Sequence, residues 1–251
     1  MKRHFFKFIV SFVACQFFAS CSIMPTPMQN DHAVCEHLRD KKSVSILFIG
    51  NSLSFGVPKE LEKICEENGV KINASLQAYS GWTLARHSKH AGTLEAVRRH
   101  PWDLVIIQEQ SRIPSQPIKR YTHMLPAVMR LAREARASGA MPMLYQTWGY
   151  RHGDKHRLDD DFFKMNQRLR RGYHVSSFIG GLPVVRVGDA WESEMTQGRG
   201  DALFMRDGLH PSDDGVRLNA QVFYESLFSN HAAPKNRRMR LNVSKPIRGG
   251  G

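Results

Sequence analysis

The chain has 251 residues, of which 41% are apolar and 24% are charged. A chain of this length and composition can bury a sizeable core in one domain, and it is not a disordered polymer. Its formal net charge of +13 would suit a nucleic-acid partner, but much of the excess lies in a basic start and in a C-terminal tail without acidic residues. No nucleic-acid-binding motif accompanies the charge, so we expect a solvated basic surface and no nucleic-acid partner.

The N-terminus has the features of a secretory signal. A basic start precedes an apolar run over residues 5–19, which is shorter than the roughly 20 residues that a membrane span needs. The sequence Phe18-Ala19-Ser20-Cys21 resembles the cleavage box of bacterial lipoproteins, which carry lipid on the cysteine. We therefore expect a signal peptide over residues 1–20, lipid on Cys21, and an extracytoplasmic, membrane-anchored lipoprotein in the periplasm or cell envelope. Ordinary secretion and a simple signal anchor are the alternatives.

Composition divides the rest of the chain into three segments. Residues 21–42 are mixed and polar, and we expect a tether there. Residues 43–229 form the predicted folded domain, and residues 230–251 are predicted to be a disordered basic tail. Cys35 and Cys65 are candidates for a disulfide, which is permitted outside the cytoplasm, but the sequence leaves their pairing open.

Inside the domain, strand-like and helix-like segments alternate. Strands are predicted over residues 45–49, 70–79, 102–107, 141–147 and 183–187. Helices are predicted over residues 58–68, 83–100, 121–137, 159–173 and 213–228. This alternation predicts an α/β fold, a three-layer α/β/α sandwich around a central, mainly parallel five-stranded sheet.

Ser52 lies just past the end of the first predicted strand. The apolar run over residues 45–49 is followed by Gly50 and Asn51, which turn the chain sharply. Ser52 therefore stands at the carboxyl end of a central strand, where open α/β sheets bind their ligands. A simple turn and helix cap is the alternative for this stretch.

Asp207 and His210 lie three residues apart, just before the last predicted helix. A serine hydroxyl is a weak nucleophile unless a base takes its proton and a third group orients that base. Ser52, His210 and Asp207 can fill these three roles, which predicts a catalytic triad.

Two blocks of the sequence carry a family resemblance. Gly50-Asn51-Ser52-Leu53-Ser54 resembles the nucleophile block of the SGNH (GDSL-like) hydrolases, with Asn51 where many members have Asp. Asp207-Gly208-Leu209-His210 resembles their Asp-x-x-His block. The resemblance extends over residues 43–229 and is greatest to a branch with Gly-Asn-Ser, Ser-Gly-Trp and Gln-Glu-Gln-Ser signatures. It implies an SGNH/flavodoxin-like fold and a serine hydrolase that needs no cofactor.

Hydrolysis of an ester forms a tetrahedral oxyanion, which preorganised hydrogen-bond donors stabilise. The backbone N–H of Ser52 is one candidate, and Gly81 matches the family's second donor by its place after the second strand. The family's third donor, an Asn in a Gly-x-Asn-Asp block, is absent here. An amide of Gln can donate in its place, and we expect Gln108 to do so, with Gln110 as the alternative.

Three side chains at strand ends are candidates for binding substrate. Trp82 and Trp148 are placed to wall a sugar pocket together with Gln110, although aromatic side chains at strand ends often only pack. His152 and His156 have a helix-like spacing but no evident third ligand, so no metal site is predicted. The other two histidines of interest, His87 and His90, are expected on a solvated helix face.

These features together favour an extracytoplasmic serine esterase that hydrolyses small acyl esters. The family resemblance implies acetyl esters as the substrates, with carbohydrates as a candidate alcohol part. The expected partners are a small-molecule or glycan ester and, through Cys21, a membrane; the oligomeric state is open. An O-acyltransferase with the same triad and a non-catalytic, glycan-binding envelope lipoprotein are the alternatives.

Overall fold

The computed structural model describes residues 27–228, and its centre is a parallel sheet of five strands in the order β2-β1-β3-β4-β5. The strands are β1 (Val44–Gly50), β2 (Ile72–Ala78), β3 (Leu104–Ile107), β4 (Met141–Tyr145) and β5 (Val184–Val185). Every neighbouring pair is parallel. The predicted fold class is therefore confirmed.

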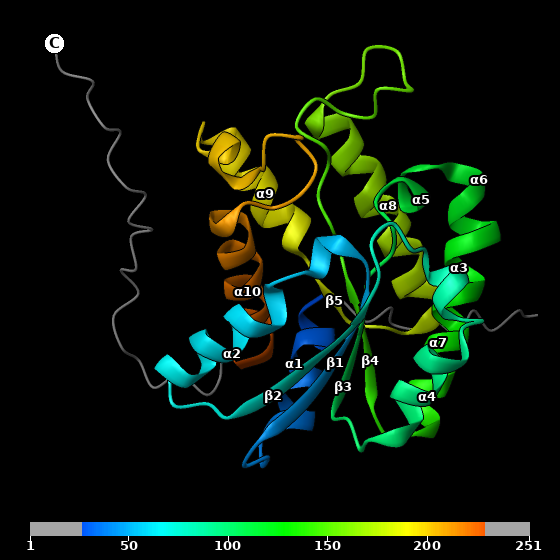
Figure 1. Cartoon of the computed structure of the whole chain (residues 1–251), viewed down its shortest axis with the longest axis vertical. Helices are drawn as coiled ribbons and strands as arrows, with labels where there is room; N and C mark the ends of the chain where they lie inside the picture. Colours follow the sequence, from blue (N-terminus) through cyan, green and yellow to red (C-terminus); the bar gives the residue numbers. More distant parts are fainter. Residues whose placement is uncertain (1–26, 229–251) are drawn as a thin grey trace, which may run out of the picture.

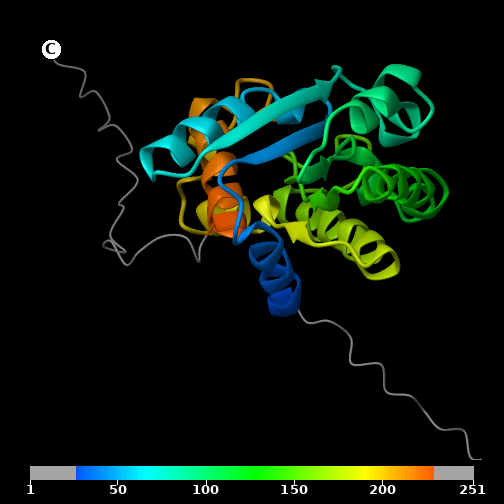
Figure 2. The same ribbon diagram turned by 90° about the horizontal axis from the view of Figure 1, so that it is seen from below.

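Helices cover both faces of the sheet (Figures 1 and 2). One face packs against α1 (Pro27–Leu38), α2 (Val57–Glu67), α9 (Val187–Thr196) and α10 (Asp213–Phe228). The other packs against α3 (Leu84–His87), α4 (Ala91–Arg99), α7 (Leu125–Ala137) and α8 (Phe162–Gly180). Short segments complete the chain: η1 (Ser52–Ser54), α5 (Arg112–Ser115), α6 (Pro117–Lys119), η2 (Arg120–Met124) and η3 (Gly200–Leu203).

The alternation of side chains along β1 explains why this strand is central. Ile46 and Phe48 enter the core on one face, whereas Leu47 and Ile49 enter the core on the other. Because full burial of such a side chain stabilises the fold by about 1.5–3 kcal/mol, a strand that is apolar on both sides belongs in the middle of the sheet.

The order of the strands places the site. The chain moves outward from β1 to β2 and then returns to pair β3 on the opposite side of β1, so the winding direction reverses between β1 and β3. Gly50 pairs with Ala78 of β2, and Ile49 pairs with Ile107 of β3. The loops after β1, β2 and β3 therefore leave the same edge of the sheet, beside the crevice where folds of this type bind ligands.

The helices differ from the prediction in detail. The single helix expected over residues 83–100 is split into α3 and α4, because His90 leaves the helical conformation and its ring accepts a hydrogen bond from Thr93 N, which caps α4. The segments α5, α6 and α9 were not predicted. The last of these begins directly after a strand of only two residues, so no turn signal separates them.

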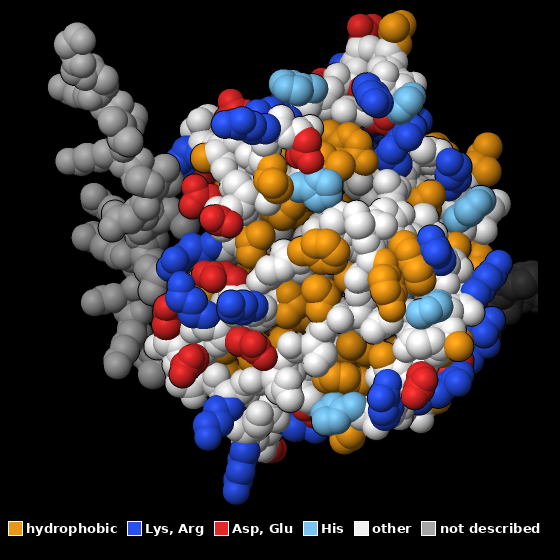
Figure 3. Space-filling view, in the orientation of Figure 1, with side chains coloured by type: hydrophobic (Ala, Val, Ile, Leu, Met, Phe, Trp, Pro, Cys, Tyr) orange, Lys and Arg blue, Asp and Glu red, His pale blue; other side chains and the backbone are white. Residues whose placement is uncertain are grey.

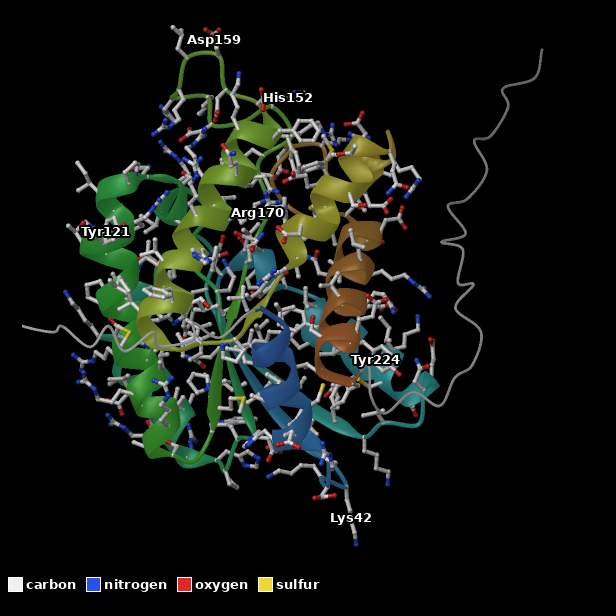
Figure 4. All side chains as sticks on the ribbon, turned by 180° about the vertical axis from the view of Figure 1, so that it is seen from behind. Lys42, Tyr121, His152, Asp159, Arg170 and Tyr224 are labelled. Carbon is white, nitrogen blue, oxygen red and sulfur yellow. The ribbon has the colours of Figure 1, made fainter. Side chains whose placement is uncertain are left out.

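Part of the predicted tether is wrong. Helix α1 lies within residues 21–42, and its Val34 and Leu38 are buried in the core beside α10 (Figure 4). The ring of His37 also lies 3.1 Å from the carbonyl of Asp103. The sequence analysis missed this helix because most of its residues are polar and only a narrow apolar stripe of it packs on the core.

Cys35 and Cys65 are both buried, and within residues 27–228 they are not joined by a disulfide. Among the residues that the structure describes, no helix has the length and apolar character needed to cross a membrane. The predicted signal peptide, the lipidation site Cys21 and the basic tail over residues 230–251 lie outside the described residues.

Candidate active site

The structure brings Ser52, His210 and Asp207 together. The Oγ of Ser52 lies 2.8 Å from Nε2 of His210, and Nδ1 of the same ring lies 2.6 Å from Oδ2 of Asp207. Ser52 and His210 are half-buried, so the Ser52 hydroxyl is open to a ligand while the His210 ring is held in place. A hydroxyl, an imidazole and a carboxylate in this sequence of hydrogen bonds are the geometry of a serine nucleophile with its general base.

The loop that carries Asp207 and His210, the candidate acid and base, is fixed by hydrogen bonds. Oδ1 of Asp207 accepts from the backbone N–H groups of Leu209 and His210, at 2.9 and 3.0 Å. Burial alone would raise the pKa of Asp207, but the hydrogen bonds from the His210 ring and these two N–H groups lower it below its ordinary value. The carboxyl group is therefore an anion, which is the form that orients an imidazole and stabilises its protonated state.

The turn over residues 51–54, called the nucleophile turn because it carries the candidate nucleophile Ser52, is held by hydrogen bonds to a buried amide. Oε1 of Gln108 accepts from the backbone N–H of Asn51 and from the hydroxyl of Ser54, both at 2.9 Å. A Cβ on Gly50 would collide with this Oε1, so only glycine lets the end of β1 approach Gln108 this closely. The Gln108 side chain is thus the support beneath the turn that presents Ser52.

The expected role of Gln108 as an oxyanion donor is not supported. Its side chain is 1% exposed, its oxygen binds the nucleophile turn, and its Nε2 donates to the carbonyl of Glu109. A donor must face the reacting oxygen, and this amide faces the interior. The error has a physical cause, because Gln108 closes a strand whose side chains point alternately into two cores.

Gln110 is better placed for that task. It is half-buried, and its Oε1 accepts from the backbone N–H of Arg112, so its amide nitrogen is the end that remains for a ligand. An amide nitrogen carries two hydrogens that it can donate. The neighbouring Ser111 hydrogen-bonds the phenol of Tyr150, and Arg151 donates its backbone N–H to the carbonyl of Gly208. The segment of Gln110 is thereby connected to the loop of Asp207 and His210.

Asn51 joins the nucleophile turn to the loop after β2. Its Oδ1 accepts from Leu53 N and its Nδ2 donates to the carbonyl of Trp82, at 3.1 and 3.0 Å. Gly81, beside Trp82, is exposed and has a left-handed φ of +70°, which glycine adopts without strain. The two backbone donors expected at the oxyanion, those of Ser52 and Gly81, therefore come from loops that Asn51 ties together.

The two tryptophans occupy different environments. Trp82 is half-buried between the ring of Tyr79, at 4.1 Å, and the guanidinium of Arg86, at 3.9 Å from its ring centre. Trp148 is 1% exposed, stacks on Trp191 and donates from its Nε1 to the carbonyl of Leu209. The expectation that Trp148 lines a substrate pocket is therefore wrong, because this ring supports the loop of the acid and base from behind.

Comparison with known proteins places the chain in a family. A scan of the sequence against models of protein families gave no match, and neither did a search of curated proteins. Among solved structures, a candidate SGNH hydrolase from Slackia heliotrinireducens is 28% identical, with a TM-score of 0.62 over 74% of this chain and 99% of its own. The chain belongs to the SGNH hydrolase superfamily.

Two further structures share the SGNH fold at lower identity. A DUF4886 family protein from Bacteroides uniformis is 19% identical, with a TM-score of 0.66 over 79% of this chain and 89% of its own. An acetyl xylan esterase is 11% identical, with a TM-score of 0.56 over 73% of this chain and all (100%) of its own. At these identities the likeness concerns the fold.

Two buried ionisable groups of this SGNH hydrolase escaped the sequence analysis. His87, expected on a solvated face, is 0% exposed, and its Nε2 lies 2.7 Å from the carbonyl of Gly50 while its Nδ1 lies 3.0 Å from Thr93 Oγ1. Burial lowers the pKa of His87 to about 4, so the ring is neutral and donates from Nε2 to the carbonyl. A histidine in a polar helix gives no sequence signal for such a role.

Glu109 is the second such group. It is 0% exposed, and its Oε1 accepts from the backbone N–H groups of Leu84 and Gln110, at 2.9 and 2.7 Å. Its own N–H donates to the phenol of Tyr173, and Oε2 has no hydrogen-bond partner within the described residues. Glu109 thus links the segment after Gly81 to the Gln110 backbone. A charged residue two positions after the end of an apolar strand was the available signal.

The histidines expected not to bind metal, His152 and His156, are both exposed on the loop between β4 and α8, and Figure 4 labels His152 there. No three His, Cys, Asp or Glu side chains within residues 27–228 are arranged to hold a metal ion.

We predict that Glu109 makes the stability of the SGNH fold depend on pH. Burial raises its pKa from 4.5 to about 7, above its value in the unfolded chain, so the folded state binds the proton more tightly. This stabilisation is complete below pH about 4.5 and is lost as the pH rises through about 7. Glu109→Gln replaces the protonated acid by a neutral amide, so urea unfolding across this range should show wild-type stability falling relative to the variant. Parallel curves for the two proteins would exclude this linkage.

Proposed function

We propose that this SGNH-type serine hydrolase cleaves small carboxylic esters by acyl transfer through Ser52. The observation that carries the proposal is the hydrogen bond of 2.8 Å between the Ser52 hydroxyl and Nε2 of His210. The serine oxygen attacks the ester carbonyl while His210 takes its proton. The tetrahedral intermediate then breaks its bond to the leaving alkoxide oxygen, which receives that proton from His210. Water, activated by the same imidazole, releases the acid and regenerates the serine.

The oxyanion of that intermediate receives three donors in this proposal. The backbone N–H groups of Ser52 and Gly81 are two of them, and the amide nitrogen of Gln110 is the third. The exposure of Gln110 and the buried, committed amide of Gln108 support this choice. Donors fixed before the reaction stabilise the developing charge most, and the Gln110 side chain is held by the backbone N–H of Arg112.

Acetyl esters of carbohydrates are the substrates that we propose. One support is that an acetyl xylan esterase has a similar fold. The other is the half-exposed Tyr79–Trp82 pair beside Gly81, which offers an aromatic surface to a sugar. The proposed location is outside the cytoplasm, with lipid on Cys21, on the strength of the N-terminal sequence.

Replacement of the nucleophile tests the reaction itself. Ser52→Ala should abolish hydrolysis of 4-nitrophenyl acetate and labelling by a fluorophosphonate probe, because both require the serine oxygen. Thermal unfolding should change little, since the Ser52 hydroxyl bonds only to the His210 ring within the described residues. Activity within a few-fold of wild type would remove Ser52 from the mechanism.

Kinetic and unfolding measurements on alanine variants distinguish the roles of Gln108 and Gln110. Gln110→Ala should lower kcat by about 100- to 1,000-fold with little change in KM, because a donor to the oxyanion acts mainly in the transition state. Gln108→Ala removes a buried support and should lower the free energy of unfolding by about 1–3 kcal/mol. Should Gln110→Ala leave kcat unchanged while Gln108→Ala lowers it in a folded protein, the assignment of the third donor is wrong.

The location is tested at the mature N-terminus. Expressed in bacteria, the protein should begin at Cys21 and carry the mass of a diacylglycerol on that sulfur. Cys21→Ser should abolish the lipid and release the protein from the membrane fraction. Intact mass spectrometry decides between the outcomes, because a start at another residue or an unmodified cysteine contradicts the lipoprotein assignment.

A further inference from the structure

A basic cleft lies beside the proposed oxyanion donor. It is an open depression of about 460 Å³ lined by Arg112, Asp154, His156 and Arg157 and walled by Gln116, Pro117 and Ile118. Figure 3 shows Lys, Arg and His side chains gathered on this part of the face, over α5, α6 and the loop between β4 and α8. None of these residues takes part in the triad.

One buried carboxylate organises the basic residues of the cleft. The Asp154 side chain is only 3% exposed, and its Oδ2 accepts from Nε of Arg112 at 3.2 Å. Its Oδ1 accepts from the backbone N–H of His156, and its carbonyl accepts from that of Arg157. Asp154 therefore holds the side chain of Arg112 and the backbone at His156 and Arg157 around one cleft.

This arrangement leaves donors for a ligand. Asp154 accepts a hydrogen bond from the Nε of Arg112, and the terminal nitrogens of that guanidinium have no hydrogen-bond partner within residues 27–228. The Arg112 side chain is 35% exposed, so a ligand can reach these nitrogens. The exposed side chain of Arg157 is likewise unpaired among the described residues. Two guanidinium groups against one buried carboxylate give the lining a surplus positive charge, and a guanidinium fork matches the geometry of a carboxylate or phosphate.

The cleft adjoins the catalytic residues through short connections. The backbone N–H of Arg112 donates to the side chain of Gln110, and Ser111 hydrogen-bonds Tyr150 at 2.7 Å. Arg151 in turn donates its backbone N–H to the carbonyl of Gly208, so hydrogen bonds connect the segments that line the cleft to the loop of Asp207 and His210. An acetyl group is too small to extend from Ser52 into it, so a group bound there belongs to the alcohol part of the ester.

We propose that this cleft, formed by Arg112, His156 and Arg157 around Asp154, binds an anionic group on the alcohol part of the substrate, so that the enzyme prefers acetyl esters of acidic sugars. The preference rests on the proposed esterase function, whereas binding of the anion itself does not. The anion is a carboxylate or a phosphate, which the guanidinium fork accepts alike.

Matched substrates test the preference. Wild-type enzyme should show kcat/KM about tenfold or more higher for an acetylated methyl glucuronoside, or for an acetylated glucose 6-phosphate, than for the acetylated methyl glucoside, because one charge-assisted hydrogen bond has about this effect. Whichever of the two anionic esters is preferred identifies the anion. Equal kcat/KM for all three esters would overturn the proposal.

Variants of the cleft connect that preference to its residues. Arg157→Gln, whose side chain has no hydrogen-bond or ion-pair partner within residues 27–228, should reduce the preference severalfold or more and leave kcat/KM for 4-nitrophenyl acetate unchanged. Arg112→Gln should reduce the preference by a similar factor. Arg133→Gln removes the same charge from the exposed face of α7 and should change neither value. A preference that survives both cleft variants would place the anion elsewhere and overturn the assignment.

A binding measurement separates this proposal from the esterase. Calorimetry of Ser52→Ala with methyl glucuronoside and with glucose 6-phosphate should give binding of at least one, weakened about tenfold by the additional change Arg112→Gln and absent for methyl glucoside. Binding without hydrolysis of any ester would retain the cleft and reject the proposed function. Hydrolysis of 4-nitrophenyl acetate without binding of either anion would retain the function and reject the cleft.

Discussion

The hydrogen bonds of the buried Gln108 amide are the contacts on which the active site depends. A parallel sheet ends in backbone groups that its own ladder does not satisfy, and here the nucleophile must turn away at that edge. Oε1 of Gln108 meets the first free N–H after β1 and the Ser54 hydroxyl, and its nitrogen satisfies the Glu109 carbonyl. An unsatisfied buried group costs about 1–3 kcal/mol, so the turn has one stable arrangement, and it presents Ser52 outward.

Two ionisable side chains extend this support to the neighbouring loops. His87 donates to the carbonyl of Gly50, and Glu109 accepts from Leu84 and Gln110, so the loops after β1, β2 and β3 are fixed from beneath. Burial lowers the pKa of His87 and raises the pKa of Glu109, because the protein interior disfavours the charged form of each side chain. Because Gln108, His87 and Glu109 are all buried, they leave the exposed side of Ser52 available to a substrate.

The sequence was sufficient for the fold and for the expectation that Ser52, His210 and Asp207 lie together, because each has a local signature: alternating strands and helices, a serine at a strand end, and an Asp-x-x-His block. It was not sufficient for side chains whose role depends on contacts between distant segments. Gln108 and Trp148 have the residue types of site residues, yet both face inward and support loops. The tether was mispredicted for the same reason, since α1 is defined by its packing on α10.

Asn51 illustrates how one such contact constrains the site. Many SGNH relatives resemble this chain at the nucleophile block but have Asp at this position, and an Asp carboxylate has no hydrogen to donate. Here the amide donates to the Trp82 carbonyl, so a carboxylate in its place would face that oxygen across about 3 Å (3.0 Å for the amide nitrogen) and repel it. The loop that carries Gly81 would then lose its tie to the nucleophile turn, and a second negative charge would stand beside the developing oxyanion. Asn51 and the Ser-Gly-Trp loop are therefore physically matched, because the hydrogen bond to the Trp82 carbonyl requires an amide donor at position 51.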